Sequence, residues 1–197
     1  IMSDILDKIL AVKADEVAKA KARRSLASLR GDVESDGALV LLYTGNARSL
    51  DGSRRSTQCL AESRDGISFA KRGPVIPAPP DGYTAHFRDP KVWRAGNEWL
   101  MVIGAQTKDE QGSILLYRGK SLMHWAFTGE LLPEHGFGYM CECPDLASVG
   151  GQEILLFCPQ GLNPEGDRFH NIYQSGYIAG HLSLDSMDMV QHTKFQE

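Results

Sequence analysis

Three short motifs in this 197-residue chain carry side chains that could perform acid–base chemistry or bind a polar ligand. The first two each contain a carboxylate, Asp89 and Glu142. Cleavage of a glycosidic bond needs such groups, because one carboxylic acid protonates the leaving oxygen while another attacks or stabilises the oxocarbenium-like sugar. Arg88 beside Asp89 would keep that carboxyl ionised and could bind sugar hydroxyls. The three motifs are His86–Trp93, Cys141–Asp145 and Tyr173–Tyr177.

Each motif also has a plainer interpretation. An Arg-Asp-Pro triplet, as at residues 88–90, is more often a turn with a local ion pair. A single glutamate between two cysteines, such as Glu142, is more often a strand residue that faces solvent. Asp145 follows Pro144 in a composition that favours an Asx-type turn. The residues alone leave the catalytic and the structural interpretation open.

The chain beyond residue 36 has the pattern of short β-strands separated by turns, with Arg64–Gly66 as a hairpin turn and no predicted helix. A weak repeat runs through it, because Gly96–Val102 aligns with Gly151–Phe157 at an offset of 55 residues. The segment Gly37–Leu42 resembles a still earlier copy. The predicted strands are Ala38–Tyr43, Thr57–Glu62, Ile67–Lys71, Lys91–Arg94, Glu98–Gly104, Ile114–Arg118, Trp125–Gly129, Glu153–Cys158 and Gln174–Ala179.

Several short strands per unit, repeated at about 50 residues, favour the four-stranded blades of a β-propeller, with a sandwich of similar strands as the alternative. The first two motifs lie just ahead of a hairpin, at equivalent places in successive repeats. In a propeller such places are close to the innermost strands, which converge on the central axis. We therefore expect Asp89 and Glu142 to face one shared cleft.

The first part of the chain has a different pattern. Apolar residues recur at helical spacing from Asp4 to about Arg24, and this stretch contains no glycine or proline. Ser3 can cap the helix. The sequence thus predicts a helix and linker at residues 1–35 and a β-rich domain at residues 36–197. The apolar positions are Ile5, Leu6, Ile9, Leu10, Val12 and Val17.

Composition narrows the function further. Hydrophobic residues at 42% and charged residues at 23% are ordinary for a soluble globular protein. A net charge of −4 makes nucleic acid an unexpected partner, and no apolar run is long enough to span a membrane. No signal-peptide pattern is found, so the cytoplasm is the expected compartment. The four cysteines lack metal-site spacing and are expected to be buried thiols: Cys59, Cys141, Cys143 and Cys158.

Taken together, the motifs resemble glycoside hydrolase family 32, the family of sucrose-6-phosphate hydrolases and invertases. The family carries an Arg-Asp-Pro and a Glu-Cys-Pro-Asp motif in this order and at about this separation. The resemblance implies that Glu142 is the general acid/base, that Asp89 is the transition-state stabiliser, and that Arg88 and Asp89 bind the fructosyl unit. Other matching segments are Tyr43–Asn46, Gln58–Ala61, Ser63–Gly66, Pro159–Gly161 and Gln174–Tyr177.

Together with the strand pattern and the N-terminal helical stretch, this resemblance predicts an all-β fold, a partial five-bladed β-propeller of about three blades preceded by one N-terminal α-helix. It also implies retaining hydrolysis of a β-fructofuranoside, such as sucrose or sucrose 6-phosphate, with no metal and no organic cofactor. A propeller of fewer blades than its relatives leaves apolar blade faces open to water. We therefore expect a homo-oligomer, most simply a dimer.

One family feature is missing. The family's nucleophile is the Asp of an Asn-Asp-Pro-Asn-Gly-type motif in the first blade, and the 197 residues contain no such motif. The segment Asn163–Gly166 is no substitute, because it follows Glu142 and lacks the Asp. The expectation is negligible activity from this chain alone. The alternative is a non-catalytic chimeric fragment that acts as a structural or self-associating module.

Residues 2–34 resemble another protein, indole-3-glycerol phosphate synthase, whose opening helix and loop they match. The barrel strands that carry that enzyme's catalytic residues have no counterpart in this chain, so synthase activity is not expected. The sequence thus reads as a composite chain joined near residues 34–36.

Overall fold

The computed structural model describes residues 37–132, 136–183, 186, 188–191 and 193–197, together with six residues of the N-terminal stretch (11, 12, 14, 15, 18 and 19). Two compact units are distinguished, residues 1–40 with 61–70, and residues 41–60 with 71–197. The strands are β1 (Leu39–Arg48), β2 (Arg54–Ser63), β3 (Ala70–Ile76), β4 (Tyr83–Ala95), β5 (Glu98–Thr107), β6 (Gly112–Ser121), β7 (His124–Glu130), β8 (Met140–Val149), β9 (Gln152–Gln160), β10 (Gly176–Ser183) and β11 (Asp188–Gln191).

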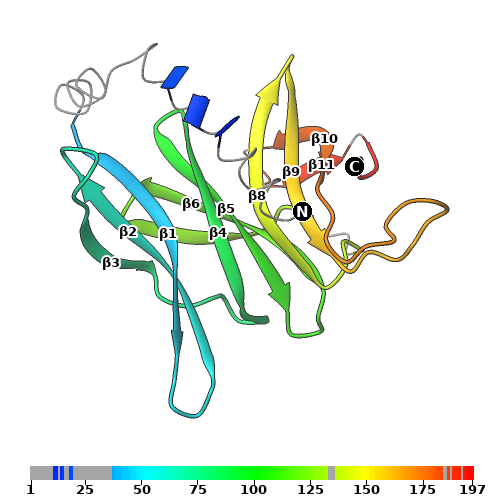
Figure 1. Ribbon diagram of the computed structural model, residues 1–197, viewed down its shortest axis with the longest axis horizontal. Helices are drawn as coiled ribbons and strands as arrows, with labels where there is room; N and C mark the ends of the chain where they lie inside the picture. Colours follow the sequence, from blue (N-terminus) through cyan, green and yellow to red (C-terminus); the bar gives the residue numbers. More distant parts are fainter. Residues whose placement is uncertain are drawn as a thin grey trace. The chain divides into compact units, whose positions relative to one another are not determined.

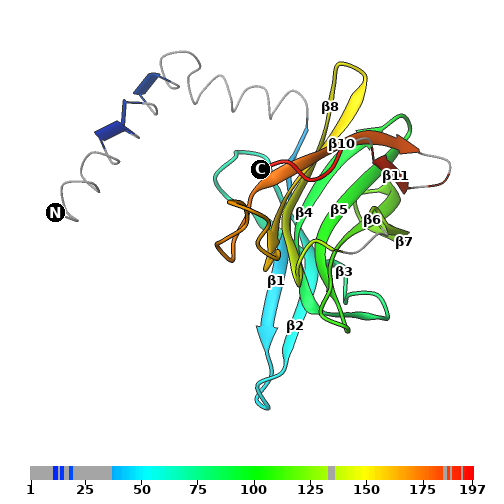
Figure 2. The same ribbon diagram turned by 90° about the vertical axis from the view of Figure 1, so that its right-hand side faces the viewer.

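The strands form three sheets in chain order (Figure 1). The first has the order β1-β2-β3, the second β4-β5-β6-β7 and the third β11-β10-β9-β8. The two four-stranded sheets are antiparallel meanders, and their first strands, β4 and β8, lie side by side (Figure 2). Consecutive meanders that meet at their first strands are the blade pattern of a β-propeller, which confirms the predicted fold class.

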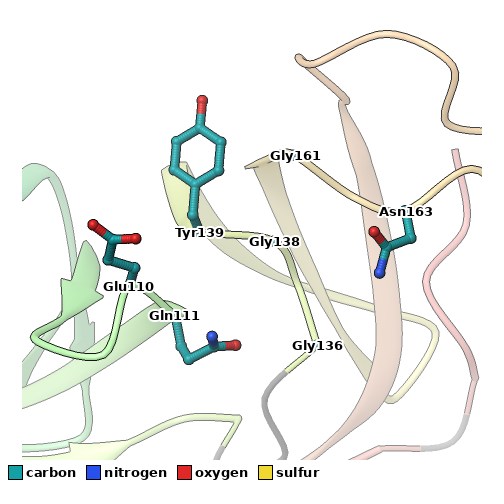
Figure 3. A pocket seen from close by; sticks show the side chains of 7 residues that line it. All are labelled: Glu110, Gln111, Gly136, Gly138, Tyr139, Gly161 and Asn163. Atoms are coloured by element: carbon teal, nitrogen blue, oxygen red, sulfur yellow. The ribbon is translucent and has the colours of Figure 1, made fainter.

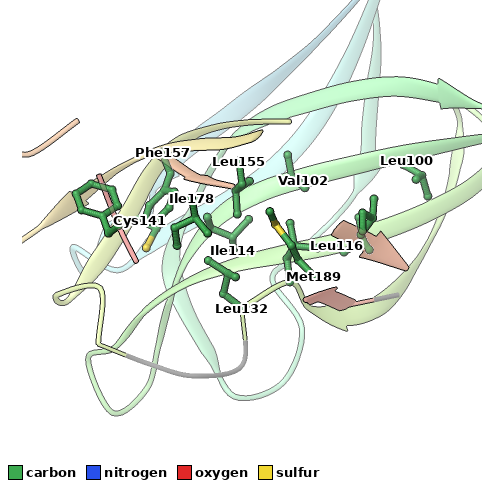
Figure 4. Packing of buried hydrophobic residues seen from close by; sticks show 13 residues of the cluster. Leu100, Val102, Ile114, Leu116, Leu132, Cys141, Leu155, Phe157, Ile178 and Met189 are labelled. Carbon is green, nitrogen blue, oxygen red and sulfur yellow. The ribbon is translucent and has the colours of Figure 1, made fainter. Parts of the chain in front are cut away.

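The middle strands of the second sheet are buried on both faces. In β5 the residues from Leu100 to Val102 alternate between two hydrophobic clusters. Leu100 and Val102 belong to the same cluster as Leu155 and Phe157 of β9 (Figure 4). Met101 packs instead with a cluster that reaches Ile76 of β3. Strands buried on both faces read as continuous apolar runs, so β5 lacks the alternation of a half-exposed strand.

One predicted strand is misplaced. The structure has bends and irregular chain at residues 66–69 where Ile67–Lys71 was predicted, and β3 begins at Ala70. The carboxylate of Asp65 accepts hydrogen bonds from the backbone N–H groups of Ile67 at 2.8 Å and Ser68 at 2.7 Å. These N–H groups are therefore unavailable to a β-ladder, and the hairpin turn extends beyond Gly66.

The N-terminal helix prediction, Asp4 to about Arg24, falls mostly outside the described residues, as do the linker and the boundary near residue 36. The six residues described in that stretch are helical. From residue 37 onward the described part of the chain contains no helix, as predicted. None of the described helical segments is long and apolar enough to cross a membrane.

Candidate active site

Strands β4 and β8 are interrupted in the same way. The β4–β5 ladder shifts register between Arg88 and Lys91, and the β8–β9 ladder shifts between Glu142 and Asp145. At each shift a residue other than glycine has a left-handed backbone, with φ of 63° at Asp89 and 47° at Cys143. A proline follows in both strands. Such bulges re-aim side chains, and both of these lie on the first strand of a blade.

Three contacts join the two bulges, each between residues 54 apart in the chain. The Arg88 guanidinium donates to Oε1 of Glu142 from both Nε and Nη2, at 3.0 and 2.7 Å. The Asp89 carboxylate accepts the backbone N–H of Cys143 at 3.0 Å. The third contact is the ion pair of Lys91 with Asp145 at 2.8 Å. The Arg88 side chain also lies 4.0 Å from the Asp89 carboxylate, so one guanidinium contacts both candidate catalytic carboxylates.

The backbone of Asp89 is held from a different blade. Its N–H donates to the Thr44 hydroxyl at 3.0 Å, and that hydroxyl donates to the Gln58 side chain at 3.0 Å. Gln58 is fully buried and donates to the carbonyl of Phe87 at 3.1 Å. Thr44 lies on β1 and Gln58 on β2, so strands of the first sheet fix the left-handed turn that presents the Asp89 carboxylate.

The charges around Glu142 favour its ionised form. Its partial burial raises the pKa, but hydrogen bonds from Arg88 and Gln160 and the nearby positive charge outweigh burial and leave the pKa below its usual value. The pKa of His86 is lowered, first by burial of its side chain and then by the positive charge of Arg88. Arg88 Nη1 lies 3.0 Å from Nδ1 of His86, so a neutral imidazole can accept its hydrogen bond.

The cysteine prediction is correct for two of the four thiols. Cys59 and Cys141 are buried, whereas Cys143 is exposed and Cys158 is intermediate, and all four are free. The left-handed backbone of Cys143 places its thiol 3.7 Å from the Asp89 carboxylate, where burial and then that negative charge raise the pKa of Cys143 to about 11. The thiol therefore stays protonated at neutral pH and can donate to Asp89.

No metal-binding group of three or more His, Cys, Asp or Glu occurs among the described residues.

The third sequence motif lies outside this network. Gln174 is buried and donates from its amide to the carbonyl of Asn171 at 2.8 Å. Its side-chain oxygen has no hydrogen-bond partner among the described residues. Its backbone N–H donates to Pro159 of β9 at 3.1 Å, so the motif borders the third blade. The structure thus brings together Arg88, Asp89 and Glu142 but gives Gln174 no direct bond to them.

Three supporting residues were given no role from the sequence, namely Thr44, Gln58 and Gln160. Thr44, Gln58 and Gln160 lie in segments that carried the family resemblance, which marked the segments without assigning a role. Their roles depend on contacts across strands far apart in the chain, and no local pattern encodes such contacts.

Glycosidic cleavage uses a pair of carboxyl groups, and here one guanidinium contacts two carboxylates on adjacent blades. Glu142 can carry a proton to or from a glycosidic oxygen, and Asp89 and Arg88 offer an acceptor and donors to sugar hydroxyls.

Comparison with known proteins shows the family of the chain. Residues 22–197 match the family described as Glycosyl hydrolases family 32 N-terminal domain. A sucrose-6-phosphate hydrolase of Bacillus subtilis (strain 168) is 47% identical over 170 residues, which cover 84% of this chain and 35% of that protein. The Escherichia coli sucrose-6-phosphate hydrolase is 51% identical over 154 residues, covering 75% of this chain and 32% of that protein.

Solved structures show the same relationship. A Bombyx mori family 32 β-fructofuranosidase has a TM-score of 0.74 at 43% identity, covering 81% of this chain and 35% of that one. A variant of the same enzyme in complex with sucrose also has a TM-score of 0.74, at 42% identity, with the same shares covered. The chain spans about a third of the length of these relatives. Because the family match covers residues 22–197, this chain belongs to family 32 of the glycosyl hydrolases.

Proposed function

We propose that Arg88, Asp89 and Glu142 form the fructosyl-binding and proton-transfer part of a β-fructofuranosidase site, with sucrose or sucrose 6-phosphate as substrate. The observation that carries this proposal is the contact of one guanidinium with both carboxylates across two adjacent blades. The names of the related proteins, sucrose-6-phosphate hydrolase and β-fructofuranosidase, support the choice of substrate.

Glu142 has two tasks in a retaining reaction. As an acid it gives a proton to the glycosidic oxygen while the bond from that oxygen to the fructosyl carbon breaks. As a base it later takes a proton from the water that releases the fructosyl unit. The Arg88 guanidinium favours the ionised form, which suits the second task. Once its N–H groups donate to sugar hydroxyls instead of Glu142, Arg88 would favour the ionised form of Glu142 less, and Glu142 could then carry the proton needed for the first task.

Asp89 would stabilise the positive charge that develops on the fructosyl ring, and it would accept hydrogen bonds from ring hydroxyls. The backbone N–H of Cys143 and the hydroxyl of Thr44 hold this residue in place from two other strands. Such fixed partners reduce the reorganisation that the charged transition state would otherwise require.

Titration calorimetry with fructose and sucrose tests the binding part of this proposal. Asp89→Asn and Arg88→Met should each weaken fructose binding by about tenfold or more, which corresponds to about 1.4 kcal/mol. Asp145→Asn is the matched control, because its carboxylate lies at the facing bulge of β8 but pairs with the half-exposed Lys91. Fructose binding that none of these substitutions changes would place the sugar elsewhere.

We further propose that the 197-residue chain by itself turns over very little substrate. A retaining enzyme forms its covalent intermediate on a nucleophilic carboxylate, and the motif that supplies it in the family is missing from this sequence. Release of reducing sugar from sucrose and sucrose 6-phosphate should stay at background. Turnover that disappears in Glu142→Gln would contradict this and would imply a nucleophile elsewhere in the chain.

The second candidate function is that of a self-associating module in a composite chain. Leu156 of β9 is 43% exposed and Val190 of β11 is 55% exposed, in the same sheet. Exposed apolar side chains in one sheet favour association with another copy. Light scattering should then give a dimer that Leu156→Asp converts to monomer, whereas Val149→Asp, at the last residue of β8, should leave it intact. A monomeric wild-type chain would exclude this function.

A further inference from the structure

Two cavities in the described part of the chain have different surroundings. One lies at the start of β8, where glycines and polar side chains surround Tyr139, three residues before Glu142 (Figure 3). The other, which we call the strand-end cavity, measures about 330 Å³ and is lined by residues near the ends of β4 and β8. The first residues of its lining on these strands, Trp93 and Leu146, lie four positions beyond the carboxylates of the candidate active site. That spacing corresponds to about 13 Å along a strand, so the strand-end cavity is separate from the site.

The walls of the strand-end cavity are mostly apolar. Trp93 and Ala95 of β4 and Leu146 of β8 are partly buried, and they pack against the hydrophobic cluster that contains Leu100. Leu182 of β10, which is 8% exposed, belongs to the lining and to the same cluster. The volume is at the lower end of the range of about 300–1,000 Å³ that is typical of small-molecule sites. An indole with aliphatic neighbours in this volume suits a ligand with one ring or a short apolar chain.

The lining also includes a carboxylate, that of Glu153, which the neighbouring strand holds in place. Its Oε2 accepts the backbone N–H of Leu182 at 3.0 Å, and Nδ1 of His181 lies 3.2 Å from the same atom. The β9–β10 ladder ends at Glu153 and Gly180, so the side chain supplies an acceptor that β9 no longer offers to Leu182. Both contacts use Oε2, and within the described part of the chain Oε1 makes no hydrogen bond. One oxygen of a fixed, 20% exposed carboxylate is therefore left for a ligand.

We propose that the strand-end cavity binds a small organic ammonium ion, an amine that carries an aromatic ring or a short apolar chain. The ammonium group would donate to Oε1 of Glu153, and a hydrogen bond between two charged groups is stronger than one between neutral groups. The apolar part would lie against Trp93, whose ring also attracts a cation placed over its face. Among the described residues of the lining there is no lysine or arginine that would compete for the carboxylate.

Other classes of small molecule suit this lining less well. An anion would be repelled by the Glu153 carboxylate. A sugar has hydroxyls on every side, and only three polar side chains line the cavity, those of Ser148, Glu153 and His181. Most of its hydroxyls would therefore face apolar walls without a hydrogen-bond partner. A neutral apolar molecule would fill the space but leave Oε1 without a donor. Only a ligand with both an apolar body and a positive charge satisfies the whole lining.

Calorimetric titration of the full 197-residue chain with benzylamine, benzyl alcohol and glucose tests this inference. Benzylamine should bind with a Kd of about 1 mM, as expected for so small a ligand, and benzyl alcohol should bind about tenfold more weakly or worse. Glucose should show no measurable binding in the same range. At about ten times its Kd, benzylamine should raise the unfolding midpoint of the chain by about 3–6 °C, because it binds only the folded state.

Two variants locate the amine. Glu153→Gln should weaken benzylamine binding by about tenfold or more, because the amide keeps an acceptor for the Leu182 N–H but loses the charge. Ala147→Phe should abolish binding, because Ala147 is an exposed residue of the lining and a larger side chain there fills the cavity. The matched control is Glu110→Gln, which removes a carboxylate from the cavity at the start of β8 and should leave the affinity unchanged.

Thermal melts without ligand report whether each variant folds, and Glu153→Gln decides the question if Ala147→Phe does not fold. Equal affinities for benzylamine and benzyl alcohol would overturn the inference, since the carboxylate would then play no part. Unchanged benzylamine affinity in Glu153→Gln would also overturn it. Weaker binding in Glu110→Gln would place the amine in the other cavity, and glucose binding more tightly than benzylamine would reject the ammonium ion as the ligand.

Discussion

Gly104 controls how closely the second and third blades approach at the candidate site. It lies on β5 opposite Arg88 in the ladder. A Cβ at this position would lie 2.2 Å from the carbonyl oxygen of Cys141 on β8 and 3.4 Å from the carbonyl oxygen of Arg88. The nearest obstacle belongs to the backbone, so no change of rotamer relieves it. In Gly104→Ala the contact with Cys141 must lengthen to at least 3.0 Å, which moves β5 away from β8.

The expected cost follows from this displacement. Overpacking of a well-packed interior costs about 1–3 kcal/mol, and a backbone obstacle places Gly104→Ala toward the upper end. For a chain of this size each kcal/mol lowers the unfolding midpoint by about 2–4 °C, so the melt should shift by about 5–12 °C. Because β8 carries Glu142, fructose affinity should fall as well. Thermal and urea unfolding, followed by calorimetry at a temperature where the variant is folded, measure both effects.

Gly52→Ala is the control. Gly52 has a φ of 83° and nothing within 4 Å of its Cβ position, so alanine there introduces backbone strain without a collision. The strain costs about 1 kcal/mol and should leave fructose affinity unchanged. A Gly104→Ala variant as stable as the wild type, with the same fructose affinity, would refute the close approach of β5 to β8.

Three further substitutions probe the network around the bulges. Thr44→Val leaves the N–H of Asp89 without its acceptor and should lower the free energy of unfolding by about 1–3 kcal/mol in urea titrations. Lys91→Met removes only a half-exposed ion pair and should change stability by less than about 1 kcal/mol in the same titrations. Because the folded state lowers the pKa of Glu142, its stabilising effect is present above the ordinary value of 4.5 and is lost as pH falls through the lower folded value. The difference in unfolding free energy between wild type and Arg88→Met should therefore shrink in acid, and a difference independent of pH would argue against the ion pair.

Most strands could be predicted from the sequence because the pattern that marks them, an apolar run bounded by turn residues, is local. Runs such as Glu98–Gly104 and Ile114–Arg118 are apolar and bounded by turns, and the structure confirms strands there with ends shifted by a few residues. The strand at Ile67–Lys71 was wrong because a single side chain, that of Asp65, competes for the backbone N–H groups.

Strand β8 was not among the predicted strands, and β4 was predicted only from Lys91 onward. Both omissions have the same cause. Each strand contains a proline and charged or polar residues where the bulge lies, and these residue types indicate a turn when taken alone. The ladder resumes on both sides of the bulge because partners on β5 and β9 supply the hydrogen bonds. Sequence reasoning thus fails at the positions where the chain departs from a regular strand to present functional groups.

The exact repeat also differs from the sequence alignment, and the difference explains the site. Alignment of identical residues in the two hairpins gave an offset of 55. The ladders instead pair Ala95 with Glu98 in one blade and Val149 with Gln152 in the next, which is an offset of 54. At that offset Asp89 corresponds to Cys143. The sequence analysis had placed Asp89 and Glu142 at equivalent positions, and the structure shows that they are not equivalent. Arg88 corresponds instead to Glu142, so the two blades contribute opposite charges at this position. At the next position the Asp89 carboxylate faces the backbone N–H of Cys143. Because side chains alternate along a strand, a shift of one residue would have placed like charges together. The repeated bulge therefore supplies the geometry, and the sequence difference between the two copies supplies the complementary pair that the proposed chemistry uses.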